Sequence, residues 1–168
     1  MEEILLNYQG IIGAIAGTVL GTVTTLITTH ILRNHGKVQT SIFDVEYKKI
    51  EKDSFNPYNM IRLDFKVKFY NMSESNKVLD DVELIFLNDK NTELLSVAPD
   101  DRDTFRSSQY SAYIDKLYFV NLSPKQLALK KLQIEVTDED LEDLESIRVV
   151  KLKCINNKRK KKYDVYKR

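Results

Sequence analysis

Two hydrophobic patterns divide the chain near residue 37, one continuous and one alternating. Residues 11–32 contain no formally charged side chain, and Arg33 follows them directly. At about 1.5 Å per residue, a helix of this length crosses the hydrocarbon core of a bilayer. After residue 37, apolar and polar side chains alternate, which is typical of strands with one buried face. The pattern therefore predicts one transmembrane helix followed by a β-rich domain.

The clearest alternation lies between residues 61 and 70, with one apolar and one mostly charged face. The apolar face consists of Ile61, Leu63, Phe65, Val67 and Phe69. Shorter alternating runs occur at 43–48, 82–86 and 132–136, and the stretches 113–121 and 147–155 are rich in β-forming residues. About seven short strands separated by turn residues favour an immunoglobulin-like antiparallel β-sandwich, with a small closed barrel as the alternative.

One short helix is expected inside this domain, at residues 138–145. Thr137 would be its N-cap, and the carboxylates that follow suit the first turn of a helix. The predicted organisation is a flank at 1–10, a transmembrane helix at 11–32, a linker at 33–37, a β-sandwich at 38–157 and a basic C-terminal tail at 158–168.

The charges that flank the apolar stretch predict its orientation. Glu2 and Glu3 precede it, whereas Arg33 and Lys37 follow it. The positive-inside rule then places the N-terminus outside the cell membrane and the domain in the cytoplasm. A cleaved signal peptide would need a positive start and a shorter apolar run. An exported, membrane-anchored binding domain is the alternative topology.

Small residues recur at every fourth position of the predicted helix, which places them on one face. The series is Gly13, Gly17, Gly21, Thr25 and Thr29. Such a face permits close approach of a second helix in lipid, so we expect association with like or partner helices. In one alternative to association, the threonine hydroxyls bond only to the backbone of their own helix and the face has no partner. In the other, the helices form an oligomer that makes a pore or disrupts the membrane. His30, near the inner end, is expected to reach the interface.

The net charge of +1 conceals a basic end. Five consecutive cations stand there, Lys158, Arg159, Lys160, Lys161 and Lys162. Clustered cations near a membrane attract anionic headgroups, so we expect these residues to bind lipid. The alternatives are contact with nucleic acid, a solvated end, or an edge strand that its lysines protect from aggregation.

The run from Phe65 to Asn71, a polar loop, and the run from Leu79 to Leu84 resemble one group of proteins. These are small bacterial single-pass membrane proteins that carry an immunoglobulin-like β-sandwich. The resemblance implies a sandwich over roughly residues 40–155 and supplies no catalytic residues. The frequent Lys, Asn and Ile also hint at a bacterial AT-rich genome.

The composition leaves little catalytic chemistry available. Both histidines, His30 and His35, lie in or beside the apolar stretch, and Cys154 is the single cysteine. A Ser-His-Asp triad, a Cys-His pair and a zinc site of Cys and His are therefore excluded from the domain. No phosphate-binding glycine loop occurs. We expect no cofactor, no metal and no enzymatic activity.

Two further features have ordinary interpretations. Asp100, Asp101 and Asp103 surround Arg102 in a predicted solvated loop, without the spacing of an EF-hand. Cys154 alternates with apolar neighbours and is predicted to be a small core residue. The sequence thus favours a non-enzymatic membrane protein whose sandwich binds an unidentified protein, as a scaffold, sensor or accessory subunit.

Overall fold

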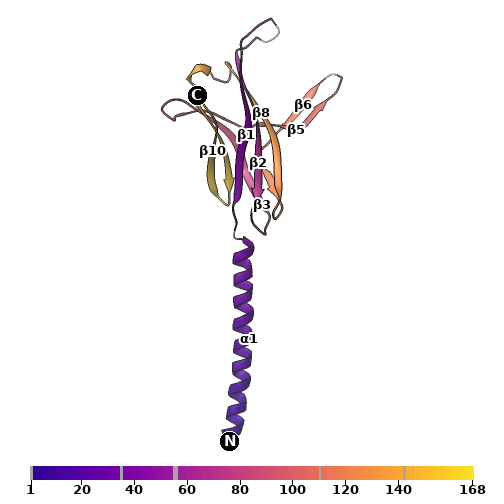
Figure 1. Cartoon of the computed structure of the whole chain (residues 1–168), viewed down its shortest axis with the longest axis vertical. Coiled ribbons are helices and arrows are strands. Elements are labelled where there is room, and N and C mark those ends of the chain that lie inside the picture. The colour runs from indigo at the N-terminus through magenta and orange to yellow at the C-terminus, as the bar shows by residue number, and fades with distance from the viewer. Residues whose placement is uncertain (1, 35, 55–56, 110, 142) are drawn as a thin grey trace.

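Among the residues that the structure describes, one long helix precedes a domain of ten strands and extends from one end of it (Figure 1). The structure, a computed structural model, describes residues 2–34, 36–54, 57–109, 111–141 and 143–168, with the side chains of all but residues 2–12 and 32–34. The elements are α1 (Glu2–Asn34), β1 (Val38–Ile50), β2 (Met60–Asn71), β3 (Lys77–Leu87), β4 (Glu93–Val97), β5 (Asp100–Ser107), β6 (Ala112–Lys116), β7 (Val120–Leu122), β8 (Leu127–Thr137), the 3-10 helix η1 (Leu144–Ser146), β9 (Val149–Asn156) and β10 (Arg159–Lys167).

The strands form two antiparallel sheets, which confirms the predicted sandwich rather than a closed barrel. One sheet has the order β1-β2-β8-β5-β6, and the other has the order β10-β9-β3-β4. Strand β7 pairs with the start of β3, and β4 pairs with its end. The described residues form ten strands instead of about seven. The predicted stretches overlap seven of them, since 113–121 reaches both β6 and β7. Strands β4 and β5 were missed and β10 was only an alternative, because β4 is short and β5 and β10 are rich in charge.

The core lies between the two sheets and consists of the predicted apolar faces. In β2 the odd-numbered residues from Ile61 to Phe69 are at most 2% exposed. They face buried side chains from the second sheet, including Leu84, Phe86 and Leu152. Strand β8 contributes Leu132, Ile134 and Val136, also as predicted. Hydrophobic burial on this face fixes the register, because a shift by one residue would expose the whole set.

Strand β1 departs from the predicted alternation. Phe43 pairs with Lys66 on the outer face of the sheet and is 38% exposed, whereas Tyr47 pairs with Leu63 on the inner face. A β-bulge separates the two, and Asp44 within it has a φ of 52°. The extra residue of a bulge moves the following side chains to the opposite face. The prediction that Phe43 and Tyr47 share one buried face is therefore wrong.

The predicted helix at 138–145 is also wrong in position and length. The structure has only η1, with Asp143 as its N-cap, and residue 142 lies outside the described residues. Asp140 instead folds back, so that its Oδ2 accepts hydrogen bonds from the N–H and hydroxyl of Thr137, at 2.9 and 2.8 Å. Asp side chains compete for nearby backbone donors in this way and favour turns over helices.

The acidic cluster that was predicted to lie in a solvated loop belongs to strand β5. Asp101 is only 3% exposed, and its Oδ2 lies 2.6 Å from Nζ of Lys130 on β8. Asp100 lies 3.3 Å from Nζ of Lys116 on β6. Both carboxylates therefore have lysine partners within the sheet.

Strand pairing defines which end of the sandwich lies next to the helix. Val38, the first residue of β1, pairs with Asn71, the last residue of β2. We call this end the basal end (Figure 1). The same pairing pattern brings three turns together there, at residues 72–76, 123–126 and 157–158.

Helix α1 is long and apolar enough to cross a membrane between Gly13 and Ile31, with a mean hydropathy of 1.4. None of that segment is buried against the sandwich. Its length and composition also fit a signal sequence, so the structure gives one candidate membrane span without an orientation. Residue 35 of the predicted linker 33–37, which is also one of the two histidines, lies outside the described residues.

Candidate functional site

The small residues predicted to form an association face lie on the open surface of α1. Beyond the helix's own backbone, a Cβ added at Gly13, Gly17 or Gly21 would meet nothing within 4 Å. A groove of about 510 Å³ continues this surface past Gly21. It is lined by Leu20, Gly21, Thr24, Thr25, Thr28 and Thr29. The face is therefore flat and slightly hollow, a shape that allows a second helix to approach closely.

Several threonine hydroxyls of this helix are satisfied within it. Thr18 donates to the carbonyl oxygen of Ala14 at 2.8 Å, and Thr22 donates to that of Thr18 at 2.8 Å. Thr25 donates to the carbonyl oxygen of Gly21 at 2.7 Å. Backbone bonding of this kind keeps a hydroxyl from being unpaired in lipid. Thr25 thus contributes shape to the face, while its only donor is already in use.

The five basic residues lie in a hairpin rather than in a free tail, which corrects the boundary predicted at residue 158. Asn157 and Lys158 have φ values of 50° and 63°, as a two-residue type I′ turn requires. Arg159 then pairs with Asn156, and Lys162 pairs with Lys153. This is the edge-strand alternative. The lysine content of this segment suggests a solvated end, but its backbone pairs with β9 and forms an edge strand.

Most of these cations point away from the core. Lys160 and Lys162 are exposed, whereas Lys161, opposite the buried Cys154, is half-buried. In the described part of the chain, no ion pair includes any residue from 158 to 162. Their charge is therefore available to a partner.

Beside this hairpin, one carboxylate is held strongly in its ionised form. Glu83 Oε2 lies 2.6 Å from Nζ of Lys153 and accepts a hydrogen bond from the hydroxyl of Ser96 at 2.8 Å. The hydrogen bond from Lys153 is the main reason that the pKa of Glu83 is lowered, and the charge of Lys160 adds to it. The thiol of Cys154 behaves in the opposite way, because burial raises its pKa to about 11. Cys154 is fully buried, as predicted for a core residue.

A buried polar cluster organises the basal end. Asn71 is 0% exposed, and its Nδ2 donates to the carbonyl oxygens of Ser75, Leu122 and Ser123 at 2.8, 3.2 and 2.9 Å. Its Oδ1 accepts from the N–H and the hydroxyl of Ser73 at 3.0 and 2.6 Å. One side chain thereby joins the turns 72–76 and 123–126, and provides hydrogen-bonding partners for backbone groups of both.

The linker from the helix is attached to the same turns. The N–H of Met72 donates to the carbonyl oxygen of Lys37 at 3.1 Å. Gly36 has a φ of 147°, and a Cβ there would come within 2.6 Å of Cα of Ser73. Lys125 donates from Nζ to the carbonyl oxygen of Met72 at 2.9 Å and lies 3.0 Å from Glu74. The chain is thus fixed to the sandwich within three residues of the end of α1.

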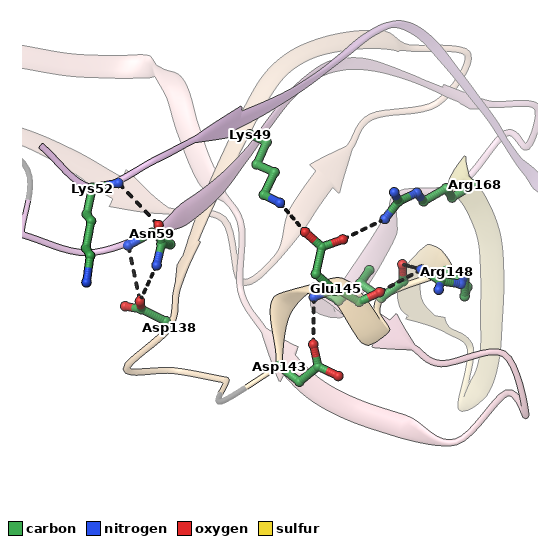
Figure 2. A network of polar contacts seen from close by, with 9 residues as sticks. Lys49, Lys52, Asn59, Asp138, Asp143, Glu145, Arg148 and Arg168 are labelled. Carbon is green, nitrogen blue, oxygen red and sulfur yellow. Dashed lines mark hydrogen bonds and ion pairs between the residues drawn. The ribbon is translucent and has the colours of Figure 1, made fainter.

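At the opposite end, a second polar network joins the two sheets (Figure 2). Glu145 forms ion pairs with Lys49 of β1 and, at 3.2 Å, with Arg168, next to the end of β10. Hydrogen bonds from these two partners lower the pKa of Glu145. Tyr47 and Tyr166 stack nearby, with ring centroids 4.5 Å apart. These contacts close the seam between β1 and β10.

Sequence reasoning missed the basal cluster. Asn71 was part of the run that carried the resemblance, but nothing in the sequence marked its side chain as buried. A single available signal was its position: Asn71 continues the odd-numbered series of buried β2 residues by one further step. A polar residue in that register predicts a buried side chain with hydrogen-bonding partners.

A two-layer sandwich on one apolar helix defines the class of this molecule as a helix-linked immunoglobulin-like domain. The chain belongs to the YopI Ig-like domain family, whose model matches residues 27–167. This match includes β10, in agreement with the corrected boundary. The chain is 35% identical over 136 residues to the SPbeta prophage-derived uncharacterized protein YopI of Bacillus subtilis (strain 168), covering 74% of this chain and 73% of that protein. The resemblance to bacterial immunoglobulin-like proteins is therefore confirmed.

Two solved structures are similar at a lower level. A crystallographic target of the Northeast Structural Genomics Consortium has a TM-score of 0.38 at 8% identity, covering 80% of this chain and 85% of that chain. A Bordetella pertussis protein assigned as ApaA has a TM-score of 0.40 at 7% identity, covering 79% of this chain and 91% of that chain. Scores in this range do not establish a shared fold.

Proposed function

We propose that this protein is a non-enzymatic single-pass membrane protein. In this proposal α1 spans the bilayer and associates with like or partner helices. The sandwich binds a second protein, so that the molecule acts as a scaffold, sensor or accessory subunit at the membrane.

The exposed apolar surface of α1 carries the proposal. From Gly13 to Ile31 the helix has no formally charged residue, and no part of this segment is buried against the sandwich. Leu20 and Leu26 are 67% and 64% exposed. An uncovered apolar surface of this extent is a liability in water and is satisfied in lipid or against another helix.

The surface of α1 supports association more than it supports a pore. The three open glycines form the flat side, and the groove beyond Gly21 extends it. Thr18, Thr22 and Thr25 already donate to carbonyl oxygens one turn earlier. Hydroxyls engaged in this way leave fewer donors for water in a channel, so helix packing is the function that we propose for this face.

For orientation, we propose an external N-terminus and a cytoplasmic sandwich, because Arg33 and Lys37 follow the span and no cation precedes it. Reporter fusions to the C-terminus test this directly. A fluorescent protein that matures only in the cytoplasm should be active there. Activity of an alkaline phosphatase fusion instead would establish the exported topology.

For the protein-binding surface, we propose the hairpin of β5 and β6, which projects from the sandwich (Figure 1). Its aromatic residues Phe105 and Tyr113 are 52% and 66% exposed, and the guanidinium of Arg102 lies 6.0 Å from the ring centre of Phe105. Exposed aromatic and arginine side chains are the residues that most often dominate binding at interfaces.

The hairpin is tested by crosslinking in detergent-solubilised membranes from the native host. The double change Phe105→Ser and Tyr113→Ser should remove a partner that the unchanged chain retains. Tyr58→Ser, which changes an exposed aromatic residue outside the hairpin, is the matched control. Equal recovery of the partner by all three chains would contradict this assignment of the surface.

Helix association is tested in bilayers with chains that carry Thr24→Cys in the groove. The buried Cys154 should not compete, since burial raises its thiol pKa. Gly17→Ile should strongly reduce disulfide-linked dimers, because its branched side chain fills the flat face. Ala16→Ile adds comparable bulk about 100° around the helix and should have little effect. Unchanged crosslinking in Gly17→Ile would contradict association through this face.

A further inference from the structure

The basal end has an uneven charge distribution. We define the basal surface as the exposed residues of the linker, the three basal turns and the first position of β10 that carry charge or a large apolar side chain. It consists of Lys37, Met72, Glu74, Lys125, Lys158 and Arg159. Four of these are cations and one is an anion, and Glu74 is paired with Lys125. Lys37, Lys158 and Arg159 have no ion pair among the described residues.

The tether restricts the distance of this surface from the helix. Four residue steps separate Asn34, the last residue of α1, from Val38. A fully extended chain of that length spans only about 14 Å. The hydrogen bond from Met72 to Lys37 shortens the path further. With α1 in a bilayer, the start of the sandwich at Val38 therefore lies within about two screening lengths of the end of the helix, at about 8 Å each at physiological ionic strength.

The basal surface is also held in one shape. The side chain of Asn71 joins two of its turns, and the type I′ turn fixes Lys158 in the third. Gly36 packs against Ser73 and brings the linker into the same unit. A hollow of about 260 Å³ lies at this end, lined in part by Asn76, Asn121 and Ser123. Cations fixed on a rigid surface lose less entropy on binding than those of a free tail.

We propose that the basal surface docks on the headgroups of anionic phospholipids and holds the sandwich in a fixed position above the bilayer. The proposal rests on the proposed function, because it needs α1 in the membrane. Charge complementarity with phosphodiester headgroups carries it. Met72 and Leu127, which are 47% and 50% exposed at the same end, add apolar side chains suited to the interfacial region. The proposed cytoplasmic orientation of the sandwich places this surface beside the inner leaflet, whose anionic lipids give it a negative surface potential.

The test uses the full-length chain in vesicles of phosphatidylcholine alone, or of phosphatidylcholine and phosphatidylglycerol in equal parts. An environment-sensitive fluorophore is attached at Ser123→Cys, an exposed basal position, and quenched by a headgroup spin label on phosphatidylcholine. Ser54→Cys, beyond the far end of β1, provides a distal label. Quenching of the basal label should increase with phosphatidylglycerol and decrease again at high salt, while that of the distal label should stay low.

Removal of charge provides the matched comparison. The double change Lys158→Gln and Arg159→Gln should lower the ratio of docked to undocked molecules about 25-fold, at about fivefold for each cation near the surface. Lys52→Gln with Lys90→Gln removes the same charge from exposed positions away from the basal end and should leave the ratio unchanged.

Flotation of the vesicles separates the two proposals. A chain that does not float with the vesicles contradicts the membrane span itself. A chain that floats, but whose basal label responds equally in both lipid mixtures, overturns the docking proposal alone. Equal loss of docking in the basal and control double variants also overturns it. So does a basal label that responds to single-stranded RNA but not to phosphatidylglycerol, a result that would assign the surface to nucleic acid.

Discussion

The side chain of Asn71 should contribute more to stability than any other polar group at the basal end. Asn71→Ala removes five hydrogen bonds of 2.6–3.2 Å and leaves the buried carbonyl oxygen of Leu122 without this donor. A hydrogen bond contributes about 0.5–1.5 kcal/mol net, and an unsatisfied buried group costs about 1–3 kcal/mol. Because these contacts share one side chain and are not additive, we expect a loss of about 3–5 kcal/mol.

A loss of this size would be a large part of the total stability of the sandwich, which for a domain is about 5–15 kcal/mol. Thermal unfolding of the full-length chain in detergent, followed by circular dichroism of the β-structure, should show a midpoint lowered by about 10–20 °C. Asn121→Ala, at an exposed residue of β7, is the control and should shift the midpoint by little. A loss below about 1 kcal/mol in Asn71→Ala would refute the organising role of this side chain.

The remaining predictions concern three single positions. Lys153 lowers the pKa of Glu83 below the usual 4.5, so ionised Glu83 stabilises the fold above that pH and the contribution is lost as pH falls through the folded pKa. Glu83→Gln should therefore lower the unfolding midpoint at about pH 7 and by progressively less as the pH falls through the folded pKa, and an effect that does not change with pH would contradict the ion pair. Cys154 should react with a thiol reagent only after denaturant is added, whereas rapid labelling of the native chain would show that it is not buried. Gly36→Ala should lower the unfolding midpoint for two reasons: the added Cβ would clash with Cα of Ser73, and the φ of residue 36 is one that alanine avoids. An unchanged midpoint would show that the linker can move away from Ser73.

Alternation of apolar residues was sufficient to predict the two-layer fold. The buried faces of β2 and β8 follow from a period of two, because each of these strands packs mainly on one side. The apolar helix follows in the same way from its length and lack of charge. These features depend on neighbours along the chain, which a sequence pattern records directly.

The features that were missed depend on which segments of the chain pair with each other. Strand β10 looks like a basic tail until β9 is known to pair with it, and β5 looks like an acidic loop until Lys130 is placed beside Asp101. The bulge at Asp44 changes the face of Tyr47 without any change in the apolar pattern. Similarly, the hydrogen bonds of Asn71 join turns that lie about fifty residues apart. A pattern of single residues carries no record of such pairings.

The location of α1 in a bilayer is tested most directly by membrane extraction from the native host. Washing the membrane fraction with alkaline carbonate, followed by flotation, releases peripheral proteins and retains those that span the bilayer. The account predicts that the full-length chain stays with the floated membranes and leaves them only in detergent. Recovery of the intact, unprocessed chain in the carbonate supernatant would contradict it.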